Sequence, residues 1–157
     1  MFTGKQAGNC EDAIRFYTSV FRDAQDRGIN RYGSGEEPEK EGTVRFGQFQ
    51  LEGQQFAAMD SARAHGFAFN EAISLLVHCE TQEEIDYYWE RLSADPRAEQ
   101  CGWLKDQYGL SWQITPRAMD EMLASKDPKK IAAVTAAFLK MKKFDIAKLQ
   151  KVYDAAG

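Results

Sequence analysis

Polar and large apolar side chains alternate in the segment that ends near residue 114, and the polar ones are the first candidates for chemistry. Leu110, Trp112 and Ile114 are expected on one face of an extended strand. Ser111 and Gln113 are then on the opposite face. If that polar face lines a cleft, the two side chains orient a ligand by hydrogen bonds. Otherwise they form internal hydrogen bonds inside a closed sheet.

Other side chains could complete such a site. Trp103 could stack on a flat ligand, although packing is the simpler role. Asp60 and Glu71 stand at the ends of predicted strands and could form a carboxylate pair near the mouth of the cleft, with a role as acid or base. The candidate cleft-lining residues are therefore Ser111, Gln113, Trp103, Asp60, Glu71 and Ser74.

The remaining reactive residue types give no catalytic constellation. His78 and Cys79 are neighbours on a predicted strand, so their side chains point to opposite faces and cannot form a nucleophile–base pair. His65 stands in a connector and could reach a cleft. Lys105 and Asp106 precede a turn, where we expect an ordinary surface ion pair. No catalytic residue is assigned from the sequence.

The composition excludes several classes of protein. The chain has 157 residues, enough for one domain or two small halves, and its net charge of −4 argues against a nucleic-acid binder. No apolar run approaches the roughly 20 residues of a membrane span, and no secretory leader is apparent. Three cysteines without a CxxC pair favour reduced thiols over a disulfide framework or zinc site. We therefore expect a cytoplasmic protein that binds neither nucleic acid nor membrane.

The first half has the pattern of a short strand, a helix and three strands. Ile14, Tyr17 and Phe21 recur at helical spacing, and Asn9 is the expected N-cap of a helix over about 10–21. A slip in the alternation near residues 47–48 indicates a β-bulge. The strands are predicted at 28–33, 43–51 and 54–60, with a hairpin turn at 52–53 and an acidic loop at 34–42.

The same order restarts after a connector at residues 61–70. A nearly continuous apolar run over 72–79 indicates a buried strand, and Thr81 with Glu84 forms a capping box for the next helix. An offset of 71 residues places Ile14 on Ile85, Tyr17 on Tyr88 and Phe21 on Leu92. Residues 102–116 supply the closing strands. We therefore predict an α+β fold with duplicated βαβββ modules, followed by C-terminal helices over 117–157.

Five strings carry a resemblance to a known family. They are E-D-A-I-R-F-Y at 11–17, F-N-E-A-I-S-L at 69–75, C-G-W-L-K-D at 101–106, G-L-S-W-Q-I-T-P at 109–116 and M-K-K-F-D-I-A-K-L at 141–149. They resemble the PhnB-like branch of the vicinal oxygen chelate superfamily, often labelled 3-demethylubiquinone-9 3-methyltransferase domains. The resemblance implies a curved mixed sheet around a cleft, as in glyoxalase and bleomycin-resistance proteins. It also implies a homodimer and a single domain over 1–116, with halves 1–60 and 71–116.

The superfamily's enzymes usually hold a divalent metal at four strand positions. One of these would precede Met1, and the others fall near Asp60, beside Glu71 and at Gln113. A neutral amide and two displaced carboxylates suit a hard dication poorly, so we expect no metal and no other cofactor. The methyltransferase label has no support from a glycine-rich S-adenosylmethionine motif, because no G-x-G-x-x-G occurs.

The resulting hypothesis is a metal-independent protein of this fold that binds a small molecule, either as an enzyme or as a binder. Three alternatives stay open. The first is a metal-dependent lyase, isomerase or dioxygenase of the same superfamily. The second is a methyltransferase, as the family label says. The third is a drug-sequestering binder without turnover.

Overall fold

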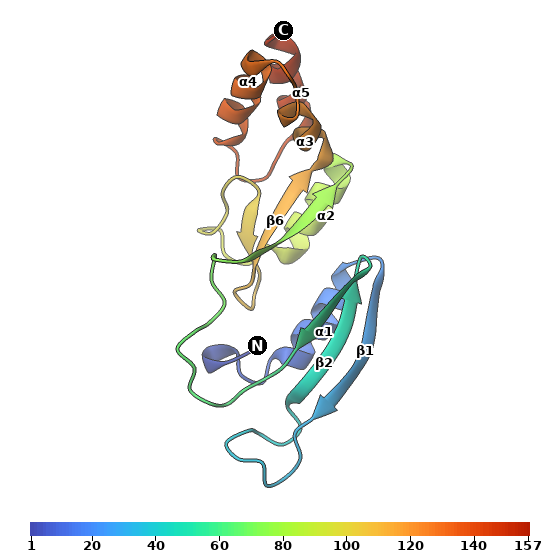
Figure 1. Ribbon diagram of the computed structural model, residues 1–157, viewed down its shortest axis with the longest axis vertical. Coiled ribbons are helices and arrows are strands. Elements are labelled where there is room, and N and C mark those ends of the chain that lie inside the picture. The colour runs from blue at the N-terminus through green and yellow to red at the C-terminus, as the bar shows by residue number, and fades with distance from the viewer. The chain divides into compact units, whose positions relative to one another are not determined.

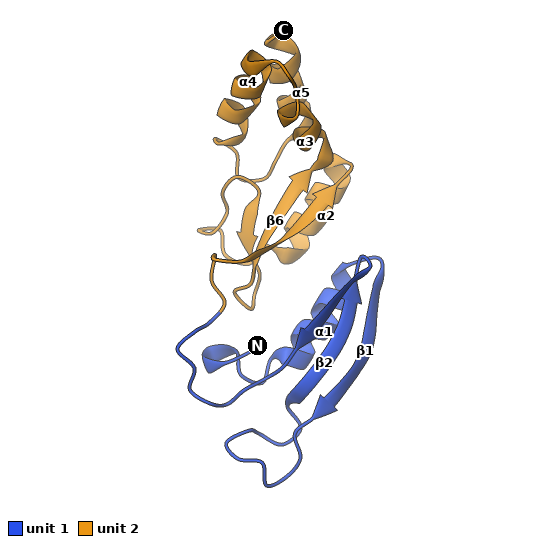
Figure 2. Cartoon of the chain, viewed as in Figure 1, with its two compact units in different colours: residues 1–68 blue, residues 69–157 orange.

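The computed structural model describes residues 1–157 and has two three-stranded sheets and five α-helices (Figure 1). The chain divides into two compact units, Met1–Ala68 and Phe69–Gly157 (Figure 2). The boundary falls inside the predicted connector. Each unit holds one sheet, and the second also holds the C-terminal helices, which confirms the predicted α+β class. None of the helices is long and apolar enough to cross a membrane.

The first unit is a βαβββ module whose first strand is reduced to one bridge. Phe2 forms this parallel bridge with Asp60, and its amide donates to the carbonyl oxygen of Met59 over 2.7 Å. The sheet order is β1-β2-β3, with both pairs antiparallel. The elements are the 3-10 turn η1 (Gly4–Gln6), α1 (Cys10–Val20), β1 (Ala24–Arg31), β2 (Val44–Leu51) and β3 (Gln54–Ala58).

Helix α1 covers one face of this sheet. Ile14 is fully buried, and the ring of Tyr17 stacks on Phe49 of β2 at 6.3 Å between centroids. The hairpin turn is confirmed, because Glu52 and Gly53 both have positive φ (47° and 78°), as a tight two-residue turn requires. The opposite face of the sheet carries no helix of this unit.

The register of β1 and β2 slips near the predicted bulge, but the extra residue is on β1. Asp26 pairs with Phe49 and Gly28 with Gln48, so Arg27 is left without a partner in the register. A second irregularity follows between Asn30 and Arg31. An unpaired residue bends its strand and re-aims its side chain.

The second unit is an abbreviated form of the same module. Its sheet order is β4-β6-β5, with β4 and β6 parallel and β5 and β6 antiparallel. Its elements are β4 (Ser74–Cys79), α2 (Gln82–Leu92), β5 (Trp103–Lys105), β6 (Ser111–Pro116), α3 (Arg117–Leu123), α4 (Pro128–Phe138) and α5 (Ile146–Ala155).

The helices of the two modules bury equivalent residues. The side chain of Thr81 accepts from the amide of Glu84 over 3.2 Å, which confirms the predicted cap. Ile85 is fully buried like Ile14, and Tyr88 is buried like Tyr17. The offset of 71 residues therefore pairs positions that pack in the same way.

The prediction that the first strand of the second half is buried was wrong. β4 is an edge strand, and Ile73 and Leu76 are 75% and 48% exposed. Hydrophobicity alone does not distinguish a central strand from an edge strand, because both present apolar residues to the core. The central strand is β6, which pairs with β4 on one side and with β5 on the other.

The C-terminal helices are tied to the sheet by a loop over Gly102. This glycine has a φ of +78°, and a Cβ atom there would overlap the ring of Phe144. The amide of Gly102 donates to the carbonyl oxygen of Lys142 over 2.7 Å. The side chain of Gln82 donates to the carbonyl of Phe144 (3.1 Å) and accepts from the amide of Ile146 (3.0 Å). Two of the family strings, at 101–106 and 141–149, therefore meet here.

Candidate functional site

The sheet of the second unit has one apolar and one polar face, as the alternation predicts. Trp112 and Ile114 are 2% and 0% exposed on the apolar face. On the polar face the side-chain amide of Gln113 donates to the Ser74 hydroxyl over 2.8 Å. Trp103 of β5 is half-buried and pairs in register with Gln113. Three of the predicted site residues are therefore neighbours on this face, which we call the polar face of β4-β6-β5.

Ser111 contributes an unusual group to this face. Its register partners are Ser74 on β4 and Lys105 on β5. It is 1% exposed, and its hydroxyl oxygen has no hydrogen-bond partner. A buried hydroxyl without a partner costs about 1–3 kcal/mol, so native proteins keep few of them. Such a group is suited to a ligand atom that restores the missing bond.

Glu71 forms an ion pair at the border of the polar face. Its carboxylate contacts the ammonium group of Lys105, and this hydrogen bond holds the pKa of Glu71 below its ordinary value. An ionised carboxylate that is already paired is a weak base. The structure thus joins Glu71 to Lys105, and it contradicts the expected ion pair between Lys105 and Asp106.

Asp106 is buried and organises the turn between β5 and β6. It is 3% exposed, and its carboxylate accepts from the amides of Tyr108 (2.9 Å) and Leu110 (3.1 Å). The other oxygen accepts from the indole nitrogen of Trp112 over 2.8 Å. Gly109 has a φ of +85° and closes the turn. The string from Lys105 to Trp112 is thus a structural motif that positions Ser111 and Gln113.

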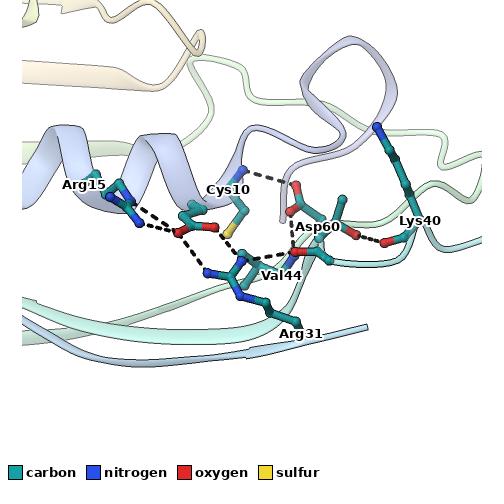
Figure 3. Close-up of polar contacts among 9 residues, drawn as sticks. Cys10, Arg15, Arg31, Lys40, Val44 and Asp60 are labelled. Atoms are coloured by element: carbon teal, nitrogen blue, oxygen red, sulfur yellow. Dashed lines mark hydrogen bonds and ion pairs between the residues drawn. The ribbon is translucent and has the colours of Figure 1, made fainter. Parts of the chain in front are cut away.

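Asp60 has a similar structural role in the first unit (Figure 3). It is 2% exposed, and its carboxylate accepts from the amides of Gly8 (2.8 Å), Cys10 (3.2 Å) and Val44 (3.0 Å). It therefore caps α1 from a distant part of the chain. Asn9, the predicted cap, makes no such bond with its side chain. A ligand-binding role for Asp60 stays a prediction.

The thiols of the two buried cysteines, Cys10 and Cys79, are poor nucleophiles. Burial, with the charge of Asp60 adding to it, raises the pKa of the Cys10 thiol to about 12. Burial also raises the pKa of the Cys79 thiol to about 12. The thiolate is the nucleophilic form of cysteine, so both groups are inert near neutral pH.

Each histidine has a partner that sequence reasoning did not identify. Nδ1 of His78 lies 3.2 Å from a carboxylate oxygen of Asp120, which belongs to α3. Nε2 of His65 lies 3.0 Å from the Ser61 hydroxyl. No local pattern connects a strand residue to a helix that begins beyond another strand, so the His78–Asp120 pair needed the tertiary structure.

The residues present do not fit the divalent metal that the fold family implies. No group of three or more histidine, cysteine, aspartate or glutamate side chains is placed to share a metal ion. At the expected position on β6, Gln113 offers only a neutral amide oxygen, and its side-chain nitrogen donates to Ser74. Hard dications prefer several oxygen ligands with negative charge among them. No step through a metal is therefore derived.

Sequence reasoning also missed a hollow in the first unit. It has a volume of about 200 Å³ and is lined by Arg27, Gln48, Phe49, Gln55 and Phe56. Strand alternation places Gln48 and Gln55 on the face away from α1 and Phe49 and Phe56 on the other face. The arginine is brought to them by the slip in register.

Each unit has a small sheet covered by a helix, and this α+β architecture is shared with solved PhnB-like structures, consistent with a glyoxalase-like fold. A Bacillus cereus PhnB protein, named as a 3-demethylubiquinone-9 3-methyltransferase, is 42% identical with a TM-score of 0.61, over 70% of this chain and 92% of its own. A Pseudomonas aeruginosa protein shares the fold at 16% identity, with a TM-score of 0.56 over 70% and 90% of the two chains.

The family model described as 3-demethylubiquinone-9 3-methyltransferase matches residues 1–115, and the chain belongs to this family. The predicted membership of the PhnB-like family is confirmed. The match ends at the last strand, so helices α3 to α5 lie outside it. A comparison with curated proteins found no match.

Proposed function

We propose that this protein binds a small, flat organic molecule on the polar face of β4-β6-β5, without a metal ion. The observation that carries the proposal is the buried hydroxyl of Ser111, which has no partner and neighbours the bonded pair of Ser74 and Gln113. We expect this ligand to have at least one polar edge, because the face offers hydrogen-bonding groups.

Each residue of the face has a distinct task in this proposal. The Ser111 hydroxyl gains a bond when the ligand arrives. The carbonyl oxygen of the Gln113 side chain can accept from the ligand, because the bond to Ser74 uses the amide nitrogen. Trp103 offers a half-buried aromatic surface for stacking. A few placed polar groups beside an apolar surface are typical of small-molecule sites.

Binding is supported more directly than turnover. The two most buried thiols are inert, and the face has hydrogen-bonding groups but no nucleophile with its base. A metal-dependent reaction needs donors that the described residues do not bring together. Neither sheet is the doubly wound parallel sheet of common nucleotide-type cofactor sites, so the family label is not carried over as an activity.

The test separates binding from stability. We expect Ser111→Ala to stabilise the free protein by about 0.5–1 kcal/mol, since it removes an unpaired buried hydroxyl. The same change should weaken the binding of the tightest ligand in a panel of small aromatic compounds by about tenfold. This is the effect expected from the loss of one hydrogen bond. Thermal shift and calorimetry measure both effects. Gln107→Ala, in the exposed turn, is the matched control.

The outcomes distinguish the alternatives. If Ser111→Ala and Gln113→Ala both bind every ligand as the wild type does, the proposal is wrong. Stabilisation by S-adenosylmethionine alone would favour the methyltransferase alternative. Stoichiometric metal in the purified protein, lost on replacement of Gln113, would favour the metalloenzyme.

We also propose a homodimer in the cytoplasm, as the resemblance and the composition suggest. The exposed apolar side chains Ile73 and Leu76 at the edge strand β4 support association. The free cysteines support a reducing compartment. Sedimentation of the wild type and of Leu76→Lys, with Leu139→Lys as the control, tests the first point. A wild type that sediments as a monomer would contradict it.

A further inference from the structure

The face of the first unit's sheet that lies away from α1 concentrates glutamine side chains around one arginine. Gln50 and Gln55 are register partners on β2 and β3, so their side chains share a face. Gln48 is two residues from Gln50 and shares that face as well. Phe49 and Leu51, between and after them, are buried on the other face against α1. The glutamines therefore stand on the face away from the helix.

Arg27 reaches this face because of the slip in β1. Its guanidinium donates to the side-chain oxygen of Gln50 over 2.7 Å. The carboxylate of the neighbouring Asp26 accepts from the amide of Gly28 over 2.8 Å. Arg27, Gln48 and Gln55 line the hollow of about 200 Å³, together with Phe49 and Phe56.

The guanidinium of Arg27 has a different kind of partner from those of most other arginines in the unit. Four of the five other arginines of the unit have carboxylate partners: Arg15 and Arg31 contact Glu11, Arg45 contacts Glu36, and Arg63 contacts Glu39. Arg27 is instead held by a neutral amide. An exposed guanidinium that is oriented but not neutralised keeps its full charge and several unused N–H donors.

This donor set favours an oxyanion that accepts two parallel hydrogen bonds. A guanidinium binds carboxylate or phosphate oxygens in pairs, and its positive charge strengthens each hydrogen bond. The amides of Gln48 and Gln55 add neutral donors without a competing charge. The hollow is smaller than the roughly 300–1,000 Å³ of sites for drug-sized ligands, so the ligand must be small.

We propose that Arg27, Gln48 and Gln55 form a site for the oxyanion group, carboxylate or phosphate, of a small organic acid. The site lies on the sheet of the first unit and uses none of the residues of the polar face of β4-β6-β5. It therefore does not depend on the function proposed above.

The test measures anion binding by ¹H–¹⁵N chemical shifts of the full chain. Benzoate is the carboxylate probe, inorganic phosphate is the second probe, and chloride at equal ionic strength is the control. We expect saturable shifts of the Gln48 and Gln55 side-chain amides and of the Arg27 guanidinium. Arg27→Gln should weaken binding by at least about tenfold, since it removes a charge-assisted pair of bonds.

Three further variants make the result specific. Arg63→Gln removes an exposed arginine of the same unit and should leave binding unchanged. Gln55→Glu keeps Arg27 but adds a negative charge, and it should also weaken binding. Ser111→Ala should have no effect on these probes, so this proposal and the proposed function fail separately.

Each outcome decides the proposal. Saturation by benzoate alone or by phosphate alone supports the site and identifies its anion. The proposal is overturned if neither probe saturates, if Arg27→Gln binds as the wild type does, or if Arg63→Gln loses as much affinity as Arg27→Gln. The spectrum of each variant without the probe shows whether it is folded.

Discussion

Replacement of Asp106 by alanine is expected to destabilise the second unit more than any surface change. The carboxylate accepts from the amides of Tyr108 and Leu110 and from the indole of Trp112. A hydrogen bond to a charged group contributes about 1.5–3 kcal/mol, and these three share one carboxylate, so their contributions do not add. Removal of the buried charge also returns its desolvation cost.

The net effect follows from these opposing terms. Asp106→Ala removes the charged acceptor of three neutral N–H donors and leaves these donors unpaired, so we expect a net cost of about 3 kcal/mol. Asp106→Asn keeps one acceptor oxygen but turns an amide N–H toward a donor, so about 2 kcal/mol is expected. Asp95→Ala removes a half-buried aspartate that pairs with the exposed Arg97, and it should cost about 0–1 kcal/mol.

Urea unfolding followed by circular dichroism measures these differences, and amide exchange localises them. The amides of Tyr108 and Leu110 and the Trp112 indole should lose protection in Asp106→Ala. Trp112→Phe should show a coupling energy of at least about 1 kcal/mol with Asp106→Ala in a double-mutant cycle. If Asp106→Ala costs no more than Asp95→Ala, the assignment of Asp106 as the organising residue is refuted.

Two further predictions concern packing and surface charge. Gly102→Ala combines a left-handed backbone with an overlap on Phe144, so it should cost about 2–4 kcal/mol and shift the urea midpoint. Because Phe144 is buried, Phe144→Ala is itself destabilising, but it should cost less in the Gly102→Ala background than alone. Hydrogen bonds from Arg31, then from Arg15, lower the pKa of Glu11 from 4.5 to about 2 (Figure 3). Because the folded pKa is the lower one, this stability is present above pH 4.5 and is lost as pH falls toward 2. Solvent screens the group, so Glu11→Gln should cost about 1 kcal/mol at neutral pH and nothing near pH 2. An equal loss at both pH values would contradict the prediction.

Local patterns predicted the helices and most of the turns. The spacing of Ile14 and Tyr17 placed α1, and the Thr81 capping box placed α2, because these signals act within one or two helical turns. The hairpin turn at 52–53 was predicted from the sequence in the same way, and its two positive φ angles confirm it. The family strings correctly indicated the PhnB-like family.

The buried aspartates show where local reasoning stops. Asp106 precedes a polar turn, and the surface ion pair expected there was wrong because its carboxylate turns inward to the Trp112 indole. Asp60 caps a helix that begins some fifty residues earlier, in place of Asn9. A charged side chain is buried only when several donors converge on it, and convergence is a property of the folded chain.

The sequence by itself determined the class of protein, the elements and the polar alternation of Ser111 and Gln113. Only the tertiary structure decided that β4 is an edge strand, that Glu71 pairs with Lys105 and that the Ser111 hydroxyl has no partner. It also decided that Arg27 stands among glutamines. Periodicity reports which face a side chain takes, whereas partners on that face depend on which distant strand lies alongside.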